Sequence, residues 1–307
     1  MDPHGVLIVD KPAGPTSHDV VDRLRRILHT RRIGHTGTLD PFASGLLPLC
    51  VGKATRLSRF FTAHDKAYTA TVRFGFATTT DDVQGEALGP ARDGVVDPDR
   101  LREAAAAFVG VIEQLPPAFS AKRTAGERHH DLARAGKVVE RTPCRVTVHS
   151  IEVRVVGDDR AEMDVVCGAG TYIRALARDL GERMGTGAHL VALRRTRSGA
   201  LTLEDAVPLA EVDATTAAQR LIPMGQLLLE IPAIVVGARG AAALRYGRGL
   251  SRELVVAGFP GEAPAERFRI VDEAGSLLAL GTPRGFGQST LGLSVDPTIH
   301  PDIVLLD

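Results

Sequence analysis

A short polar loop early in the chain gathers the side chains best suited to chemistry. Residues 32–48 read RIGHTGTLDPFASGLLP, with two glycines ahead of a single carboxylate. Pro41 disfavours a helical conformation at Asp40, and the glycines permit backbone geometries that other residues avoid. The pattern predicts a rigid loop that presents Asp40 beside His35 and two threonine hydroxyls. Such a carboxylate can act as a nucleophile, although an isolated Asp-Pro pair more often marks only a turn.

Two of the three tyrosines lie beside further basic side chains. Tyr68 follows Lys66 at the start of an alternating segment, and Tyr172 lies in GAGTYIR at 168–174. Arg174 falls outside the apolar stripe of the helix predicted there, so it is free to face a partner. A glycine turn before a helix is a general phosphate cradle, but this one lacks the P-loop lysine and the dinucleotide-binding spacing. A strand-edge aromatic and a solvated arginine are the purely structural alternatives.

The elements that would position these residues predict an α+β fold. An apolar strand at 5–10 precedes a helix capped by Ser17, and alternation at 69–76 predicts a half-buried strand. Further predicted elements are a helix beginning at Asp97-Pro98 and ending near Gly110, a strand at 144–155 whose alternation changes phase near Ser150-Ile151, a strand at 161–167 and a helix capped by Thr171. Strands and helices mix without a regular βαβ repeat, which favours α+β over a doubly wound sheet.

The domain organisation follows from a change in composition near residues 230–232. Beyond that point the chain has many glycines and short apolar segments, which predict a small β-rich domain. We therefore expect one domain at 1–230 and a second at 231–307.

Composition limits the possible classes of protein. The 307 residues are 44% hydrophobic and 24% charged, which is ordinary for a globular protein. The three cysteines are far apart and form no CxxC pair, so neither a zinc site nor a disulfide framework is expected. The absence of a signal-like N-terminus and of an apolar run of roughly 18 residues predicts a cytoplasmic protein that does not cross a membrane.

Net charge is zero, but the charge is unevenly distributed. Residues 1–60 contain nine Lys and Arg against five Asp and Glu, and the stretches 120–150 and 168–200 have the same surplus of four. A neutral total can therefore conceal a basic face of the kind that a phosphate backbone requires. Solvated helix faces are the alternative explanation.

The Asp40 loop resembles the signature of the tRNA pseudouridine-55 synthases, the TruB family. LIVDKPAGPTSH at 7–18 resembles the N-terminal motif of that family, and the resemblance covers nearly all of the first 230 residues. It implies a pseudouridine synthase fold with a mixed, mainly antiparallel sheet flanked by helices, and a C-terminal domain loosely similar to the PUA domain that binds RNA. It also implies that uridine 55 in the T-loop of tRNA is converted to pseudouridine without a cofactor or metal.

The resemblance assigns roles to individual residues. Asp40 is the nucleophile, Arg174 pairs with it, and Tyr68 stacks on the uracil and takes its C5 proton. Tyr172 and Leu193 line the pocket. Further contacts with the substrate are expected from His35, which would fill the gap left by the flipped base, and from Lys66, Arg195, Arg197, Lys122 and Arg128. Three routes stay open for Asp40: attack on C1′, attack on the ring, and assistance of elimination to a glycal.

A segment at about 114–142 resembles the insertion with which the family clasps RNA. His130 stands there in place of the usual tyrosine. The insertion and the short C-terminal domain favour a monomer that needs no guide RNA or protein partner, unlike dyskerin-like relatives. Two rivals remain: an RNA-binding protein of the same fold without turnover, and a carboxylate hydrolase such as a glycosidase. The hydrolase would need a second acid, and no second carboxylate in an equally special loop is evident.

Overall fold

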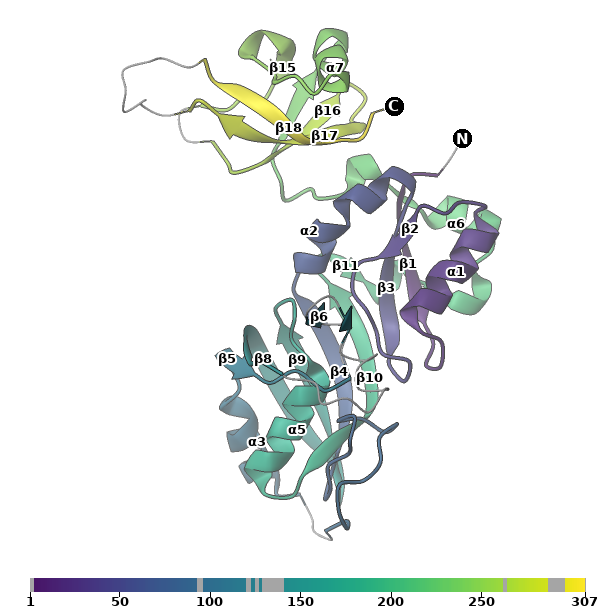
Figure 1. The fold of residues 1–307 in the computed structure, drawn as a ribbon, viewed down its shortest axis with the longest axis vertical. Helices are drawn as coiled ribbons and strands as arrows, with labels where there is room; N and C mark the ends of the chain where they lie inside the picture. The colour runs from purple at the N-terminus through teal and green to yellow at the C-terminus, as the bar shows by residue number, and fades with distance from the viewer. Residues whose placement is uncertain are drawn as a thin grey trace. The chain divides into compact units, whose positions relative to one another are not determined.

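The chain divides into two compact units in the computed structural model (Figure 1). The model describes residues 3–92, 96–119, 123–124, 127–128, 141–261, 264–286 and 296–306. The larger unit comprises residues 8–49 and 58–220, and the smaller unit comprises residues 1–7, 50–57 and 221–307. The boundary inferred from composition, after residue 230, would place the N-terminal segments 1–7 and 50–57 with the larger part.

The larger unit is built on a mixed sheet. Its strands run in the order β12-β1-β3-β10-β4-β9-β8-β5, with β11 beside β10 and β2 beside β3. The bounds are β1 (Gly5–Lys11), β2 (Ile33–His35), β3 (Ser44–Val51), β4 (Lys66–Phe74), β5 (Gly110–Gln114), β8 (Cys144–Gly157), β9 (Arg160–Cys167), β10 (Ala188–Ser198), β11 (Leu201–Thr202) and β12 (Val207–Pro208). β4, β5, β8 and β9 pair antiparallel with their neighbours, whereas β3 with β10 and β1 with β12 are parallel. The sheet is therefore mainly antiparallel, as predicted.

Helices flank this sheet and confirm the α+β class. They are α1 (Ser17–Ile27), α2 (Ser58–Ala63), α3 (Pro98–Ala106), α5 (Ile173–Met184) and α6 (Ala214–Arg220). Figure 1 shows α3 and α5 beside strands β8 and β9. Leu176 and Leu180 of α5 are buried, and so are Met163 and Val165 of β9, because each element turns an apolar face inward. Two short strands, β6 (Arg123–Thr124) and β7 (Glu127–Arg128), pair with each other.

Two helix starts differ from the sequence prediction by one residue. Thr16, not Ser17, caps α1, with its hydroxyl accepting from the Asp19 amide and the Asp19 carboxylate accepting from the Thr16 amide. Tyr172, not Thr171, is the cap of α5 and provides no side-chain hydrogen bond to the helix. The hydroxyls of the two predicted caps form other hydrogen bonds, since Ser17 bonds a distant loop and Thr171 donates to the Gly168 carbonyl.

Other local predictions are confirmed. Asp97 caps α3 and Pro98 is its first residue, although the helix ends at Ala106 and not near Gly110. The phase change predicted in β8 is a register shift between Val148 and Ser150 against β9. A bulge of this kind re-aims the side chains that follow it.

The smaller unit is β-rich, as its glycine content predicted. Five strands lie in the order β15-β14-β16-β17-β18, and β14 and β16 are parallel. Its elements are β13 (Ile222–Pro223), β14 (Ala233–Val236), α7 (Ala238–Arg245), β15 (Val255–Ala257), β16 (Phe268–Asp272), β17 (Leu277–Arg284) and β18 (Thr298–Val304). Ile234, Leu244, Ile270 and Ile299 share one apolar core. The first residues of β1, Gly5 and Val6, pair with β13 in this unit.

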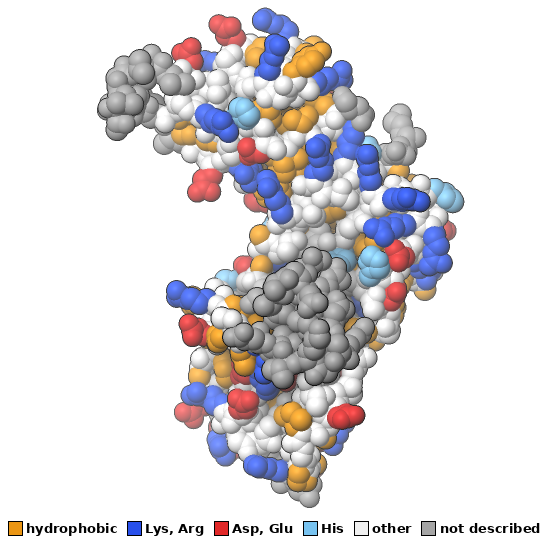
Figure 2. Space-filling model, viewed as in Figure 1, with side chains coloured by type: hydrophobic (Ala, Val, Ile, Leu, Met, Phe, Trp, Pro, Cys, Tyr) orange, Lys and Arg blue, Asp and Glu red, His pale blue; other side chains and the backbone are white. Residues whose placement is uncertain are grey.

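Basic side chains gather on one part of the larger unit. Figure 2 shows Lys, Arg and His side chains together where Figure 1 places α1. Arg26, Arg31 and Arg32 are exposed in this region, and His18 is exposed on the same helix. Among the described residues, no helix is both long and apolar enough to cross a membrane.

Candidate active site

The loop that carries Asp40 is fixed by hydrogen bonds from three other parts of the larger unit. Ser17 Oγ accepts from the Leu39 amide at 2.8 Å and donates to the Leu39 carbonyl at 3.0 Å. Arg195 donates through Nη2 to the Gly37 carbonyl at 3.1 Å. The Gly14 amide donates to the Pro41 carbonyl at 2.8 Å. The predicted rigid loop is therefore held by bonds to its backbone on both sides of Asp40.

Lys11 adds a buried charge beneath the same loop. Its side chain is fully buried and Nζ donates to the carbonyls of Pro12, Pro15 and Pro41, at 2.9, 2.8 and 3.4 Å. Burial lowers the pKa of Lys11 to about 8, while the charge of Asp40 opposes this effect. The lysine of the N-terminal motif thus ties that motif to the residue after Asp40.

The glycine that this region requires is Gly45, at the start of β3. Its φ is +101°, and a Cβ there would lie 2.3 Å from the Arg195 carbonyl oxygen. A larger residue would push β3 away from β10. Gly34, by contrast, does not have a positive φ, and a Cβ at this position would meet only open space. The prediction that Gly34 is needed for its backbone conformation is therefore wrong.

Asp40 and Arg174 form a bidentate ion pair. Arg174 Nε lies 2.9 Å from Oδ2 of Asp40, and Nη2 lies 3.2 Å from Oδ1. The Arg174 side chain is only 6% exposed, which excludes the solvated alternative, whereas that of Asp40 is 33% exposed. This two-pronged geometry fixes the plane of the carboxylate, because a guanidinium donates along two parallel directions. The first turn of α5 thereby orients the carboxylate of a loop more than a hundred residues earlier.

The same guanidinium has three more acceptors. Nη1 donates to the Thr80 carbonyl at 2.9 Å and lies 3.4 Å from Asp82 Oδ2. Nη2 also donates to the Phe119 carbonyl at 2.7 Å. Burial raises the pKa of Asp40, the charge of Arg174 opposes the rise and that of Asp82 adds to it. Arg174 therefore provides the charge that favours the ionised form of Asp40.

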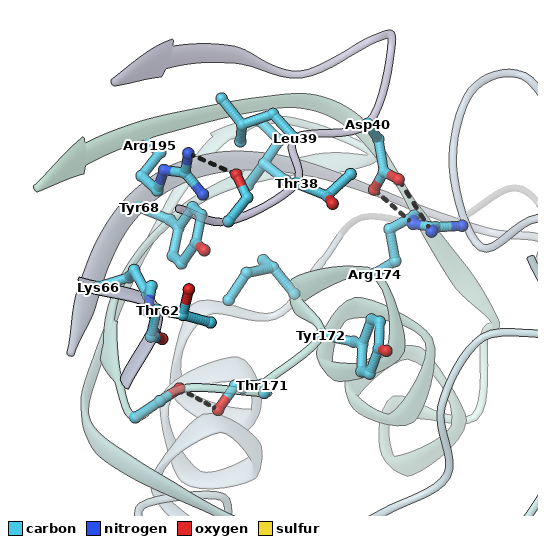
Figure 3. A pocket seen from close by; sticks show the side chains of 15 residues that line it. Thr38, Leu39, Asp40, Thr62, Lys66, Tyr68, Thr171, Tyr172, Arg174 and Arg195 are labelled. Carbon is cyan, nitrogen blue, oxygen red and sulfur yellow. Dashed lines mark hydrogen bonds and ion pairs between the residues drawn. The ribbon is translucent and has the colours of Figure 1, made fainter. Parts of the chain in front are cut away.

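A cavity of about 240 Å³ opens beside this ion pair. Its lining includes seven residues singled out from the sequence, namely Asp40, Lys66, Tyr68, Tyr172, Arg174, Leu193 and Arg195. Figure 3 shows Asp40 with Arg174 at one edge and Tyr68 with Arg195 at another. The structure thus brings together the three residues expected to be catalytic.

Tyr68 belongs to β4 and lies directly opposite Arg195 of β10. Burial raises the pKa of the Tyr68 hydroxyl, while the charge of Arg195 and a hydrogen bond from it oppose the rise. Lys66, two residues earlier, donates to the carbonyls of Thr62 and His64, both at 2.6 Å, and burial lowers its pKa to about 8. This part of the pocket therefore holds two buried cations beside one tyrosine.

Arg195 corrects one expectation. We expected it to contact phosphates, but the residue is 2% exposed and Nε donates to the Leu46 carbonyl at 2.7 Å. A guanidinium committed to buried carbonyls cannot also lie on an RNA backbone. Arg197 is half-buried and donates to the Gly199 carbonyl at 3.1 Å.

The other predicted contacts lie apart from the cavity or outside the described residues. His35 is half-buried and does not line the cavity, and its Nδ1 has no hydrogen-bond partner among the described residues. Burial lowers the pKa of His35, and Arg195 adds to this effect. Lys122 and His130 lie outside the described residues, and Arg128 is described only as backbone in β7.

Sequence reasoning missed Asp82, the second carboxylate at Arg174. The residue is 3% exposed, and Oδ1 accepts from Thr80 Oγ1 at 2.6 Å and from the Gln84 amide at 3.0 Å. The signal was the run TTTDD at 78–82, which is polar and is separated from the end of β4 by three residues. Among the residues that the structure describes, no group of His, Cys, Asp or Glu is arranged to hold a metal ion.

Comparison with known proteins agrees with this site. The sequence profile of the TruB family pseudouridylate synthase N-terminal domain matches residues 25–173, and that of the tRNA pseudouridylate synthase B C-terminal domain matches residues 174–230. The tRNA pseudouridine synthase B of Ralstonia nicotianae is 46% identical over 260 residues, which are 82% of each chain. That of Cupriavidus metallidurans is 43% identical, over 91% of this chain and 90% of the relative.

Solved structures give the same assignment. A crystal structure of a Cbf5-Nop10-Gar1 complex contains a chain 28% identical to this one, with a TM-score of 0.73, over 99% of this chain and 85% of the other. A chain in an H/ACA RNP bound to a substrate RNA containing 2′-deoxyuridine is 26% identical, with a TM-score of 0.71, over 99% and 86%. With its fold, its pocket and these relatives in agreement, the chain belongs to the TruB family of pseudouridylate synthases, which are isomerases.

Proposed function

We propose that this protein converts uridine 55 in the T-loop of tRNA to pseudouridine. The observation that carries the proposal is the bidentate Asp40–Arg174 pair at the edge of a cavity that Tyr68 also lines. The bacterial relatives named tRNA pseudouridine synthase B support tRNA as the substrate. Position 55 comes from the resemblance of the Asp40 loop to the synthases of that specificity.

The reaction rearranges one nucleotide without a net loss of atoms. The N1–C1′ bond breaks, the uracil rotates, C5 joins C1′, and the proton on C5 leaves while N1 gains one. The uracil must first be extracted from the RNA stack, at a cost of a few kcal/mol. A partly open cavity beside a fixed carboxylate is suited to receive a flipped base.

The residues at the different edges of the pocket then perform different steps of the reaction. Asp40, held ionised and oriented by Arg174, acts at the glycosidic bond. Tyr68 stacks on the uracil and takes the C5 proton, with Arg195 beside the hydroxyl to stabilise negative charge there. Tyr172 and Leu193 close the pocket around the base.

Binding of the rest of the RNA uses surfaces outside the pocket. We assign His35 to the gap that the flipped base leaves, and the exposed arginines of residues 26–32 to phosphate contacts. We assign catalysis to residues 1–230, with the RNA-clasping insertion at about 114–142, and further RNA binding to residues 231–307 as a PUA-like domain. The protein acts as a cytoplasmic monomer that needs neither guide RNA nor a protein partner.

The rival activities fit the site less well. An RNA-binding protein without turnover has no use for a buried arginine that holds a carboxylate in a bidentate ion pair at a cavity, because a buried charge costs free energy. A glycosidase needs a second acid in contact with the substrate, and Asp82 is instead bonded to Thr80, Gln84 and Arg174.

Release of tritium from RNA labelled at C5 of uridine tests the proposal. A T-stem-loop transcript containing [5-³H]uridine should release one tritium per RNA, and mapping of the product should place pseudouridine at position 55. Replacement of uridine 55 by cytidine in the same transcript is the control and should abolish release. Tritium release from another uridine would contradict the assigned position, and no release from any tRNA transcript would contradict the activity.

A further inference from the structure

A second buried ion pair extends the Asp40–Arg174 pair into the protein. Arg178 Nη1 lies 3.1 Å from Asp81 Oδ2, and the two side chains are 13% and 11% exposed. Arg178 follows Arg174 by one turn of α5, so both arginines lie on one face of the helix. Asp81 directly precedes Asp82, the carboxylate at Arg174. Two successive carboxylates thus meet arginines on two successive turns of one helix.

The backbone of Asp81 is held in an unusual conformation. Its φ is +60°, in the left-handed region that few residues other than glycine adopt. The Asp81 amide donates to the Thr78 carbonyl at 3.3 Å, and the Asp81 carbonyl accepts from the Leu190 amide at 3.1 Å. Backbone strain of this kind persists where the surroundings enforce it and is concentrated at functional sites.

Arg178 connects this turn to the chain segment that follows β5. Nη2 donates to the Leu115 carbonyl at 2.9 Å, and Nε donates to Asp179 Oδ1 at 2.8 Å. Arg174 likewise donates to the Phe119 carbonyl in that segment. The two arginines therefore fix the same two partners, the turn at 78–85 and the segment at 115–119.

Stability does not account for the second pair. A buried ion pair costs desolvation free energy, and apolar residues in its place are often neutral or stabilising. Burial raises the pKa of Asp81, and the charge of Arg178 opposes the rise, followed by those of Arg174 and Arg141. What the pair supplies is a buried positive charge that anchors the Asp81 carboxylate, because Arg178 meets it through the single contact from Nη1 to Oδ2.

We propose that Asp81 and Arg178 are positioning residues for the reaction. They hold the turn at 78–85 so that Asp82 meets Arg174, and Arg174 in turn holds the plane of Asp40. Neither residue lines the cavity, so their effect on the reaction passes through Asp82 and Arg174. The inference rests on the proposed function only for the choice of RNA used in the test.

Asp81→Asn is the sharpest first variant. Asparagine tolerates a positive φ and retains one acceptor oxygen, so the change removes the charge and leaves the backbone conformation in place. The single-turnover rate at saturating RNA should fall about tenfold, as for coupled ionic neighbours, while the Kd for RNA stays within about twofold. Asp159→Asn is the matched control, since it removes a carboxylate 2.7 Å from Arg73 in a half-exposed pair, and should leave the rate unchanged.

The background variant Asp82→Asn shows whether the effect passes through Asp82. If it does, Asp81→Asn should cost less than about twofold when Asp82 is already asparagine. A full tenfold loss in that background would overturn the proposal. Arg178→Gln should lose rate like Asp81→Asn, whereas Arg178→Lys, which keeps a cation for Asp81, should recover most of it. Equal losses for Gln and Lys would also overturn the proposal.

The wild-type protein is measured first, so that two failures remain distinct. Absence of tritium release from the T-stem-loop, with release from another RNA, would change the proposed substrate and leave the comparison of variants valid on that RNA. Wild-type turnover with unchanged rates for Asp81→Asn and Arg178→Gln would reject the positioning pair alone.

Discussion

Two buried arginines, Arg174 and Arg195, serve opposite edges of the same pocket in different ways. Arg174 donates to the carboxylate of Asp40 and lies beside Asp82, so its charge is matched by acid. Arg195 donates to the carbonyls of Leu46 and Gly37 and hydrogen-bonds Tyr68. Its charge acts on its neighbours instead. It adds to the lowering that burial causes in the pKa values of Lys11, His35 and Lys66, and it opposes the rise that burial causes in the pKa of Tyr68.

The difference shows how burial can serve two purposes with one residue type. A guanidinium among carboxylates fixes geometry and keeps an acid ionised. A guanidinium among carbonyls has no anionic partner to neutralise its charge. Its electric field therefore favours anions and disfavours other cations nearby. The first arrangement suits a nucleophile, and the second suits a hydroxyl that must lose its proton or share one.

The largest effect on the rate is expected when Arg174 loses its anionic partner, Asp40. Asp40→Asn keeps the shape of the side chain but cannot attack or accept a proton as a carboxylate does. The single-turnover rate should fall by about 10³-fold or more, while circular dichroism and the Kd for RNA stay near wild type. Turnover within tenfold of wild type would remove Asp40 from the nucleophile role.

At the other edge, Tyr68→Phe separates stacking from proton removal. The ring remains, so affinity for RNA should hardly change, whereas tritium release should fall by roughly 10²- to 10⁴-fold. The reaction should stall after C5 has joined C1′, and chromatography of the digested RNA should separate this C5-linked isomer, which has the same mass as uridine. Normal tritium release would assign the C5 proton to another group.

Arg174→Lys tests geometry at constant charge. Lysine offers one direction of donation where arginine offers two, so the rate should fall by about 10²-fold with RNA binding retained. The pH profile adds a second readout. Burial raises the pKa of Asp40, so wild-type activity should fall on acidification at a pH above the usual 3.8 of aspartate, and in the variant at a still higher pH. A wild-type midpoint at or below 3.8 would contradict the effect of burial.

Arg195→Gln should act on stability as well as on rate. The Leu46 and Gly37 carbonyls would lose charged donors, which should cost about 1–3 kcal/mol in urea unfolding. A loss of stability well below about 1 kcal/mol would show that the bonds from Arg195 to these carbonyls do not stabilise the fold.

The smallest effect is expected from substitution of exposed arginines, which lie outside both edges of the pocket. Arg31→Ala with Arg32→Ala should flatten the slope of log affinity against log salt by about one to two units, at unchanged rate with saturating RNA. Because phosphate contacts do not read sequence, all tRNAs should be affected alike. A slope equal to that of wild type would leave these arginines as ordinary solvated charges.

Much of the fold and the three central residues could be predicted from the sequence. Alternation marked β4 and the bulge in β8, and the Asp97-Pro98 pair marked the start of α3. The cap at Thr16 could not be chosen from the sequence, because Ser17 caps a helix equally well and instead bonds Leu39. Tyr172 could not be foreseen as a cap, because Thr171 is the better capping residue but donates to the Gly168 carbonyl.

The sequence did not reveal which charged side chains of the site are buried. Arg195 and Arg197 lie in one basic run, and only the register of β10 decides that Arg195 turns inward against Tyr68. Asp82 was missed for a related reason, since its importance depends on a guanidinium more than ninety residues later. Long-range pairing of buried charges has no local pattern.

The smaller unit has a consequence for the order in which the chain folds. It combines residues 1–7 and 50–57 with residues 221–307, and the Arg56 guanidinium donates to the Val304 carbonyl almost at the C-terminus. Residues 1–7 and 50–57 are synthesised well before residues 221–307, so this unit cannot close until the later segment has left the ribosome. Residues 8–220 face no such delay, so the pocket can form while the final strands are still being synthesised. A nascent chain whose residues up to 220 have cleared the ribosome should already protect the pocket from protease, with residues 1–7 still exposed.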